Sequence, residues 1–147
     1  MSQPKLASLI PQAPPPTGEV LHISSFGIVK RGDEILLAKM LKPEMYAGKW
    51  TLPARIINFG EDPEAAMRRI VATMLGSDPN SLRLIDLQSY GDRHWDLCCV
   101  YDVRVKESSR LSGDVEKVQY FGLEALPQEL LEGHREVIQG LRNKKIL

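Results

Sequence analysis

The residues best suited to chemistry lie in one short segment, where Glu61 stands between Arg55 and Arg69. Glu61 follows Arg55 by six positions and precedes Arg69 by eight. A glutamate carboxylate is the kind of oxygen ligand that hard divalent cations prefer. A guanidinium can bind a phosphate group through two parallel hydrogen bonds. Arg55 is therefore a candidate phosphate ligand, with a plain surface arginine or a salt bridge to Glu61 as the alternative.

Most other catalytic and binding motifs are missing from the chain. There is no Gly-x4-Gly-Lys-Ser/Thr loop, no Gly-x-Ser-x-Gly elbow, no His-Glu-x-x-His pair and no Cys-x2-Cys pair. His22, His94 and His134 are scattered, which favours surface or hydrogen-bonded roles over metal binding. Cys98 and Cys99 are neighbours in an apolar strand, so they point to opposite faces and do not favour an intrachain disulfide.

A helix predicted over residues 63–75 positions this segment. Asp62 suits the N-cap, Pro63 suits the first helical position, and Gly76 supplies the C-terminal stop. At 3.6 residues per turn, one broad face of the helix is apolar; it comprises Ala66, Met67, Ile70, Val71, Met74 and Leu75. We expect this face to pack in the core, with an apolar-lined ligand pocket as the alternative.

The other predicted elements are mainly strands. They cover residues 20–30, 35–40, 50–53, 56–57, 82–90, 96–105 and 118–121. We expect the first two strands to form a hairpin around Arg31-Gly32-Asp33. A second helix is predicted over residues 130–142. Strands and helices mix without strict βαβ order, which favours an α/β (α+β) fold with a mixed sheet between helices.

The segment over residues 48–76 resembles the signature of the Nudix family, Gly-x5-Glu-x7-Arg-Glu-U-x-Glu-Glu-x-Gly-U, where U is a bulky apolar residue. Glu61, Arg69, Val71 and Gly76 match the first glutamate, the arginine, the first bulky position and the second glycine. The preceding run Gly48-Lys49-Trp50-Thr51-Leu52-Pro53 is similar to the entry often seen before this box. The resemblance covers about residues 20–142 and implies a Nudix-type α/β/α sandwich with a mixed β-sheet.

The departures from the signature fall on the positions that hold metal. Family members cleave nucleoside diphosphates linked to another group, with Mg²⁺ bound by several carboxylates on one helix face. Here Ile70, Thr73 and Met74 replace three glutamates, and Arg55 replaces the first glycine. Alkyl and thioether groups cannot hold Mg²⁺. Glu61 is then the only remaining candidate ligand, and we expect neither a metal site nor another cofactor.

The resemblance leaves three functions open. The first, which we favour, is a non-catalytic module that binds a nucleotide, an RNA or a protein. Its expected ligand-binding residues are Arg55, Glu61, Arg69 and Trp50. The second is a pyrophosphohydrolase that uses Mg²⁺, with Glu61 as a catalytic residue, help from the loop around Asp114, and Glu116 as base. The third is a structural subunit of a larger assembly. Three further aromatic residues could stack on a base, although packing is their commoner role: Tyr46, Phe59 and Trp95.

Composition gives the setting for these functions. The 147 residues include 19 Lys and Arg against 19 Asp and Glu, which excludes a polyelectrolyte binder of nucleic acid but not a local basic patch. Residues 1–18 contain five prolines and predict a flexible arm, followed by a Nudix-like domain over 19–147. Without a long apolar run or a signal peptide, we expect a cytoplasmic protein that does not bind membranes. The resemblance also implies a homodimer.

Overall fold

The computed structural model describes residues 20–91, 94–106 and 111–147, so the predicted proline-rich arm lies outside the described residues. In chain order the elements are β1 (Val20–Ile28), β2 (Lys30–Arg31), β3 (Glu34–Met40), the 3-10 helix η1 (Glu44–Tyr46), β4 (Trp50–Thr51), β5 (Ala54–Ile56), α2 (Pro63–Leu75), β6 (Pro79–Gly91), β7 (His94–Val105), β8 (Val115–Gly122) and α3 (Glu132–Asn143).

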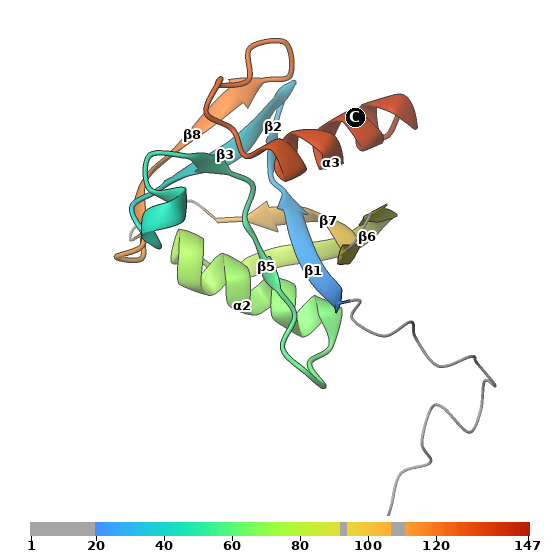
Figure 1. The fold of residues 1–147 in the computed structure, drawn as a ribbon. Coiled ribbons are helices and arrows are strands. Elements are labelled where there is room, and N and C mark those ends of the chain that lie inside the picture. Colours follow the sequence, from blue (N-terminus) through green and yellow to red (C-terminus); the bar gives the residue numbers. More distant parts are fainter. Residues whose placement is uncertain (1–19, 92–93, 107–110) are drawn as a thin grey trace, which may run out of the picture.

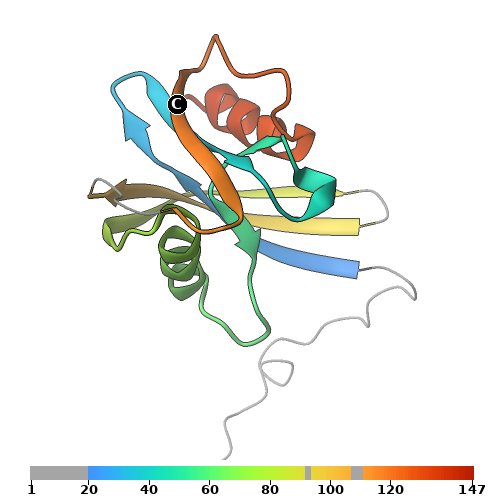
Figure 2. The same cartoon turned by 90° about the vertical axis from the view of Figure 1, so that its left-hand side faces the viewer.

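The strands form two sheets. The first has the order β5-β1-β7-β6, in which β1 and β7 are parallel and the other neighbours are antiparallel. In the second sheet β3 pairs antiparallel with β2, β4 and β8. Helix α2 lies on one side of the first sheet and α3 on the other (Figures 1 and 2). This arrangement confirms the predicted α/β fold with a mixed sheet between helices.

The predicted first hairpin is only partly correct. The turn at Gly32 is present, with φ of +60°, but the strand that pairs with β3 there is the short β2. Strand β1 belongs to the first sheet, between β5 and β7. Its residues Phe26 and Ile28 pack in one core cluster, whereas the following Val29 packs in the other. The chain thus crosses between sheets at Val29, a change that local turn chemistry does not encode.

Helix α2 has the predicted bounds. The Asp62 carboxylate accepts hydrogen bonds from the backbone N–H groups of Glu64 (3.0 Å) and Ala65 (3.2 Å), which satisfies free donors of the first turn. Gly76 ends the helix in the left-handed conformation, with φ of +61°. The six apolar residues predicted on one face are all buried. Helix α3 begins two residues later than predicted, at Glu132.

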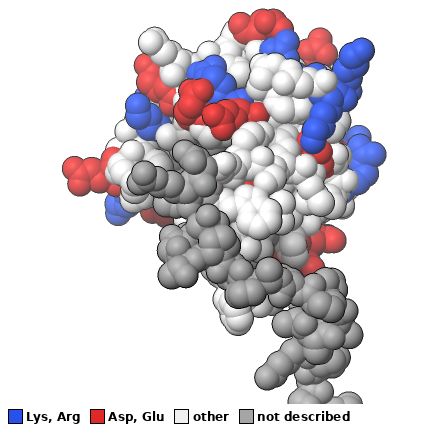
Figure 3. Space-filling model, turned by 45° about the vertical axis from the view of Figure 1, so that its right-hand side comes forward, with Lys and Arg blue, Asp and Glu red and all other residues white. Residues whose placement is uncertain are grey.

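Charged side chains are not spread evenly over the surface. On the face shown in Figure 3, Lys, Arg, Asp and Glu gather over the upper part and the margins, while uncharged side chains cover the centre. No helix in the described part of the chain is long and apolar enough to cross a membrane.

Candidate functional site

A cavity of about 830 Å³ opens on the side of the first sheet that faces α3. Its walls come from β1, from the β4–β5 segment, from η1, from β7 and from the start of α3. Arg55, Asn58 and Arg69 line one part of it, and Asp96, Glu132 and Glu136 line another. We call this cavity the cleft. Its size is typical of sites that hold small molecules, which usually run to about 300–1,000 Å³.

Arg55 on β5 brings a half-buried positive charge to the cleft. Its Nη1 donates a hydrogen bond to the carbonyl of the preceding residue, Ala54, at 2.8 Å. No carboxylate of the described residues lies within ion-pair distance of its guanidinium. Burial lowers the pKa of Arg55, the negative charge of Asp114 offsets part of this change, and the charge of Arg69 lowers the pKa again. The positive charge of the Arg55 guanidinium therefore has no ion-pair partner among the described residues, although the group is half-buried.

Glu61 forms an ion pair with Arg69 and not with Arg55. Arg69 Nε lies 2.9 Å from Glu61 Oε2, and Nη2 lies 3.0 Å from Oε1. The backbone N–H of Asn58 also donates to Oε1, at 3.0 Å. These hydrogen bonds, led by the one from Arg69, lower the pKa of Glu61. Both carboxylate oxygens are thus engaged by the protein, and Glu61 is not among the residues that line the cleft.

The positions replaced in the signature do not fit a magnesium site. Ile70 and Met74 are 0% and 1% exposed, and both pack in the core beneath the sheet, as predicted. Thr73 is exposed, and its hydroxyl donates to the Arg69 carbonyl at 2.9 Å. Nowhere in the described residues do three His, Cys, Asp or Glu side chains converge. Mg²⁺ needs several oxygen ligands at one point, so the donor set around Glu61 does not fit the ion.

The carboxylates considered for a hydrolase lie elsewhere. Glu116 on β8 forms an ion pair with Lys39 on β3, at 3.5 Å, and does not line the cleft. The backbone carbonyl of Asp114 accepts a hydrogen bond from Leu41 N–H at 2.7 Å. Its carboxylate does not line the cleft, but its charge raises the pKa of Arg55. Glu116 is therefore not placed as a base for this cleft.

The aromatic candidates divide between cleft, core and surface. The expectation for Trp50 is corrected: this ring is 7% exposed, packs edge-to-face on Phe121 with centroids 4.8 Å apart, and does not line the cleft. Phe59 and Trp95 are exposed outside the cleft. Tyr46 alone of the four lies in its wall. The backbone of Trp50 is also tied to the segment just before α3. Its N–H donates to the carbonyl of residue 129, and its carbonyl accepts from the N–H of residue 131.

Two cleft residues, Thr51 and His134, are not among the ligand-binding residues expected from the sequence. Thr51 is 3% exposed, and its hydroxyl has no hydrogen-bond partner among the described residues. His134 Nδ1 accepts a hydrogen bond from the backbone N–H of Leu52 at 2.9 Å, and its ring meets Phe26 edge-on. Burial, followed by the charge of Arg55, lowers the pKa of His134 to about 4. The imidazole is therefore neutral at pH 7, with its proton on Nε2. Only tertiary packing brings these residues to the cleft.

Cys98 also lines the cleft, but its thiol is poorly suited to act as a nucleophile. Burial, followed by the charge of Asp96, raises the pKa of this thiol to about 11. The nucleophilic form of cysteine is the thiolate, which is scarce at neutral pH under these conditions. Cys98 is therefore a wall residue and not a candidate nucleophile.

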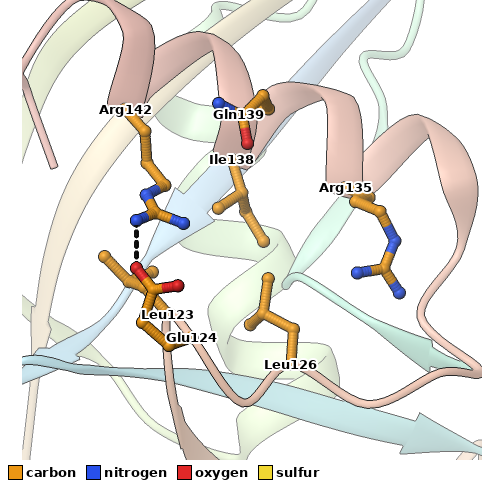
Figure 4. A pocket seen from close by; sticks show the side chains of 7 residues that line it. All are labelled: Leu123, Glu124, Leu126, Arg135, Ile138, Gln139 and Arg142. Atoms are coloured by element: carbon orange, nitrogen blue, oxygen red, sulfur yellow. Dashed lines mark hydrogen bonds and ion pairs between the residues drawn. The ribbon is translucent and has the colours of Figure 1, made fainter.

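A second, smaller pocket of about 210 Å³ lies between α3 and the segment before it (Figure 4). Leu123, Leu126 and Ile138 form its apolar part. Its arginines already have partners in the protein. Arg142 pairs with Glu124, and Arg135 donates to the Pro127 carbonyl at 2.8 Å. In this pocket, therefore, neither arginine resembles Arg55 of the cleft, which has no ion-pair partner among the described residues.

Comparison with known proteins gives one family and many similar folds. The model of a family described as NUDIX domain matches residues 21–141. Proteins named "Putative 8-oxo-dGTP diphosphatase 2" from two strains of Mycobacterium tuberculosis are 37% identical over 67 residues. That match spans 46% of this chain and 43% of theirs, so the chain matches less than half the length of these relatives.

Solved structures resemble the fold over most of its length. A MutT NUDIX hydrolase from Burkholderia pseudomallei has a TM-score of 0.69 at 23% identity, covering 81% of this chain and 96% of that one. The NUDIX domain of NrtR from Shewanella oneidensis, solved in complex with ADP ribose, has a TM-score of 0.62 at 18% identity. That comparison covers 95% of this chain and 96% of the other. At these identities the likeness concerns the fold.

Proposed function

This chain belongs to the NUDIX domain family, and on that premise we propose that it binds a phosphate-bearing, nucleotide-class ligand in its cleft without a divalent metal and without hydrolysing it. The observation that carries the proposal is Arg55. It brings a half-buried cation to the cleft, and the described residues provide no carboxylate within ion-pair distance of it. A phosphate would supply the missing negative charge.

The chemistry of Arg55 suits a phosphate better than any other group in the cleft. A guanidinium presents a planar fork that binds a phosphate through two hydrogen bonds. Arg69 lies in the same wall but is held by Glu61 through Nε and Nη2, so its Nη1 is the nitrogen left for a ligand. Together these groups favour an anionic ligand, because they bring two positive charges to one part of the cleft wall.

The rest of the cleft suits the uncharged part of a nucleotide. Thr51 offers a buried hydroxyl without a partner among the described residues, and such groups are usually satisfied in the working state. His134 offers a neutral N–H donor held by Leu52. Phe26 and two tyrosines, Tyr46 and Tyr90, add aromatic surface, on which a base or a sugar can pack.

Hydrolysis is disfavoured by what has happened to the catalytic positions. Glu61 is the one glutamate that matches the signature, and both of its carboxylate oxygens accept hydrogen bonds from the protein. The positions of the other glutamates are occupied by buried apolar side chains or by Thr73. A diphosphate hydrolase needs ligands that orient water and neutralise charge at the scissile bond. The described residues offer no such cluster.

A second candidate is the hydrolase itself, and the names of relatives favour it. The curated relatives are named as 8-oxo-dGTP diphosphatases, and a similar structure is called a MutT NUDIX hydrolase. If this chain shares that activity, its carboxylates would have to be those in the cleft wall, namely Asp96, Glu132 and Glu136. Asp96 already lies 3.5 Å from His22, and the Glu132 side chain is 79% exposed.

The test uses ADP-ribose and 8-oxo-dGTP as probes, with thermal unfolding followed in excess EDTA and in Mg²⁺. We expect at least one probe to raise the melting temperature equally in both buffers. Arg55→Ala should abolish the rise, whereas Arg83→Ala, an exposed arginine outside the cleft, should leave it intact. A rise that needs Mg²⁺, or release of a monophosphate, would establish the hydrolase instead. If neither probe nor a short RNA changes the melting temperature, the proposed ligand class is wrong and a protein partner becomes the better candidate.

A further inference from the structure

A group of exposed apolar side chains lies on the face of the first sheet that carries α2, beyond the end of that helix. Its members are Leu21 and Ile23 on β1, Leu84 and Leu87 on β6, and Trp95 on β7, and each is between 37% and 54% exposed. We call these five residues the sheet-face patch. The patch lies on the opposite side of the sheet from the cleft, because the β1 residues that line the cleft are His22, Ser24 and Phe26.

Strand register places the five residues of the patch on one face of the sheet. Alternate residues of a strand share a face. Leu21 and Ile23 therefore share the face of Ser25, whose hydroxyl donates to the carbonyl of Pro63 at the start of α2. Leu21 lies directly beside Trp95 in the parallel pair β1–β7. In the antiparallel pair β6–β7, Leu87 lies beside Cys99, a residue of the cluster beneath α2.

The indole of Trp95 is fixed in this surface. Its Nε1 donates to the Ser89 hydroxyl at 2.6 Å, so the polar end of the ring has a partner, while the residue as a whole is 53% exposed. Single exposed apolar residues are ordinary, whereas several on one flat sheet face mark a contact surface. Leu84 and Leu87 lie on β6, the edge strand of this sheet, so the surface reaches the edge.

We propose that residues 1–19 of the same chain cover the sheet-face patch, with Leu6, Leu9 and Ile10 as the docking side chains. This segment continues directly into β1 at Val20, one residue before Leu21, so it is tethered at the margin of the patch. Its three large aliphatic side chains match the apolar character of the surface. Its only charged side chains are Lys5 and Glu19, so little charge would be buried against the patch.

The length of the segment fits the distance. Ten residues lie between Ile10 and Leu21, and at the polyproline spacing of about 3.1 Å per step the chain from one to the other reaches roughly 34 Å. From the Leu21–Trp95 pair to Leu84, which lies beside Tyr101 on β7, the patch extends for about six residues along the strands, or roughly 20 Å, and across three strands, or roughly 10 Å. The prolines at positions 11, 14, 15 and 16 stiffen the connection, and Gly18 permits the reversal that docking requires.

A tethered segment also has an advantage over a free partner. Because it is linked to the patch, its effective concentration lies in the millimolar range for a short connection. Modest contacts therefore suffice to keep it in place. A second copy of the chain would have to reach a similar concentration in solution before it competed for the same surface.

The experiment uses acrylamide quenching of tryptophan fluorescence in the full chain. The two tryptophans report differently: Trp50 is 7% exposed and Trp95 is 53% exposed. The variant Leu6→Ser/Leu9→Ser/Ile10→Ser keeps the length of the segment, and Lys5→Ser/Gln12→Ser is the matched control at polar positions. We expect the triple variant to increase quenching of Trp95 about twofold, as its covering is removed. The control should behave as the unmodified chain, and in a Trp95→Phe background the difference should disappear.

Three results would overturn the proposal. Equal quenching in the triple variant and the unmodified chain would show that the segment does not cover Trp95. Protection that grows with protein concentration and ignores the triple substitution would assign the patch to a second copy. Protection that needs both the segment and a high protein concentration would place the segment on a neighbouring copy instead of on its own chain.

Discussion

Replacing Thr51 with valine should make the protein more stable and a poorer ligand binder. The Thr51 hydroxyl is buried in the cleft wall and has no hydrogen-bond partner among the described residues. A buried hydroxyl without a partner costs about 1–3 kcal/mol in protein mutational data. Valine fills a similar volume without that cost. We therefore expect the free energy of unfolding to rise by about 1 kcal/mol, which corresponds to roughly 4 °C in melting temperature for a domain of this size.

We expect the same substitution to weaken binding, because the unpartnered Thr51 hydroxyl lies just beneath the cleft wall and gains a partner when a ligand presses against that wall. One hydrogen bond contributes about 0.5–1.5 kcal/mol, so affinity for the probe should fall roughly two- to tenfold. Urea unfolding measures the first effect, and titration calorimetry with ADP-ribose in EDTA measures the second. Thr51→Ser is the matched control: it keeps the hydroxyl and loses a buried methyl group, so it should lose stability and retain affinity.

Two results would refute this reasoning. If Thr51→Val lowers the free energy of unfolding by more than about 1 kcal/mol, the hydroxyl is bonded within the protein and is not free for a ligand. If the substitution leaves affinity unchanged while Thr51→Ser weakens binding, the ligand contacts the methyl side of the residue and not the hydroxyl.

Three further predictions concern the helix and the charges beside the cleft. Ile70→Glu restores a signature residue but buries a carboxylate, so the free energy of unfolding measured in urea should fall by about 3–5 kcal/mol. This loss should shrink toward pH 4 and should not be recovered by Mg²⁺. The control Ile70→Val should lower the free energy of unfolding by only about 1 kcal/mol. The lowered pKa of Glu61 means that its contribution is present above its unfolded pKa and is lost in acid, so thermal unfolding of Glu61→Gln should differ from the parent at pH 7 and converge with it as the pH falls through the folded value. His134 should titrate near pH 4 by NMR. Since the folded state binds this proton more weakly than the unfolded state, the free energy of unfolding should fall by up to roughly 3 kcal/mol between pH 6.5 and pH 4. The fall should be smaller in His134→Gln.

Local signals predicted helix α2 and the burial of its apolar face. Asp62, Pro63 and Gly76 act within one turn of the chain, so their meaning could be read from the sequence and the structure agrees. The burial of Ile70 and Met74 followed from helical periodicity in the same way. The Glu61–Arg69 ion pair is likewise local, because it joins the loop before α2 to the second turn of that helix.

Features that depend on distant segments could not be predicted in this way. The placement of β1 in the first sheet depends on its pairing with β7, some seventy residues later in the chain. Trp50 looked like a ligand-stacking residue because its place in the sequence does not show that Phe121 packs against it. His134 reaches the cleft only because α3 packs beside the β4–β5 segment, where Leu52 fixes its ring.

The central claim is that the cleft holds a phosphate-bearing ligand and leaves it intact. The most direct measurement is ³¹P NMR of ADP-ribose mixed with an equal amount of protein in Mg²⁺ buffer. The account predicts that the diphosphate resonances shift or broaden, that Arg55→Ala removes this effect, and that no phosphomonoester resonance develops. Growth of monoester resonances with the unmodified protein, and their loss in Glu61→Gln, would contradict it.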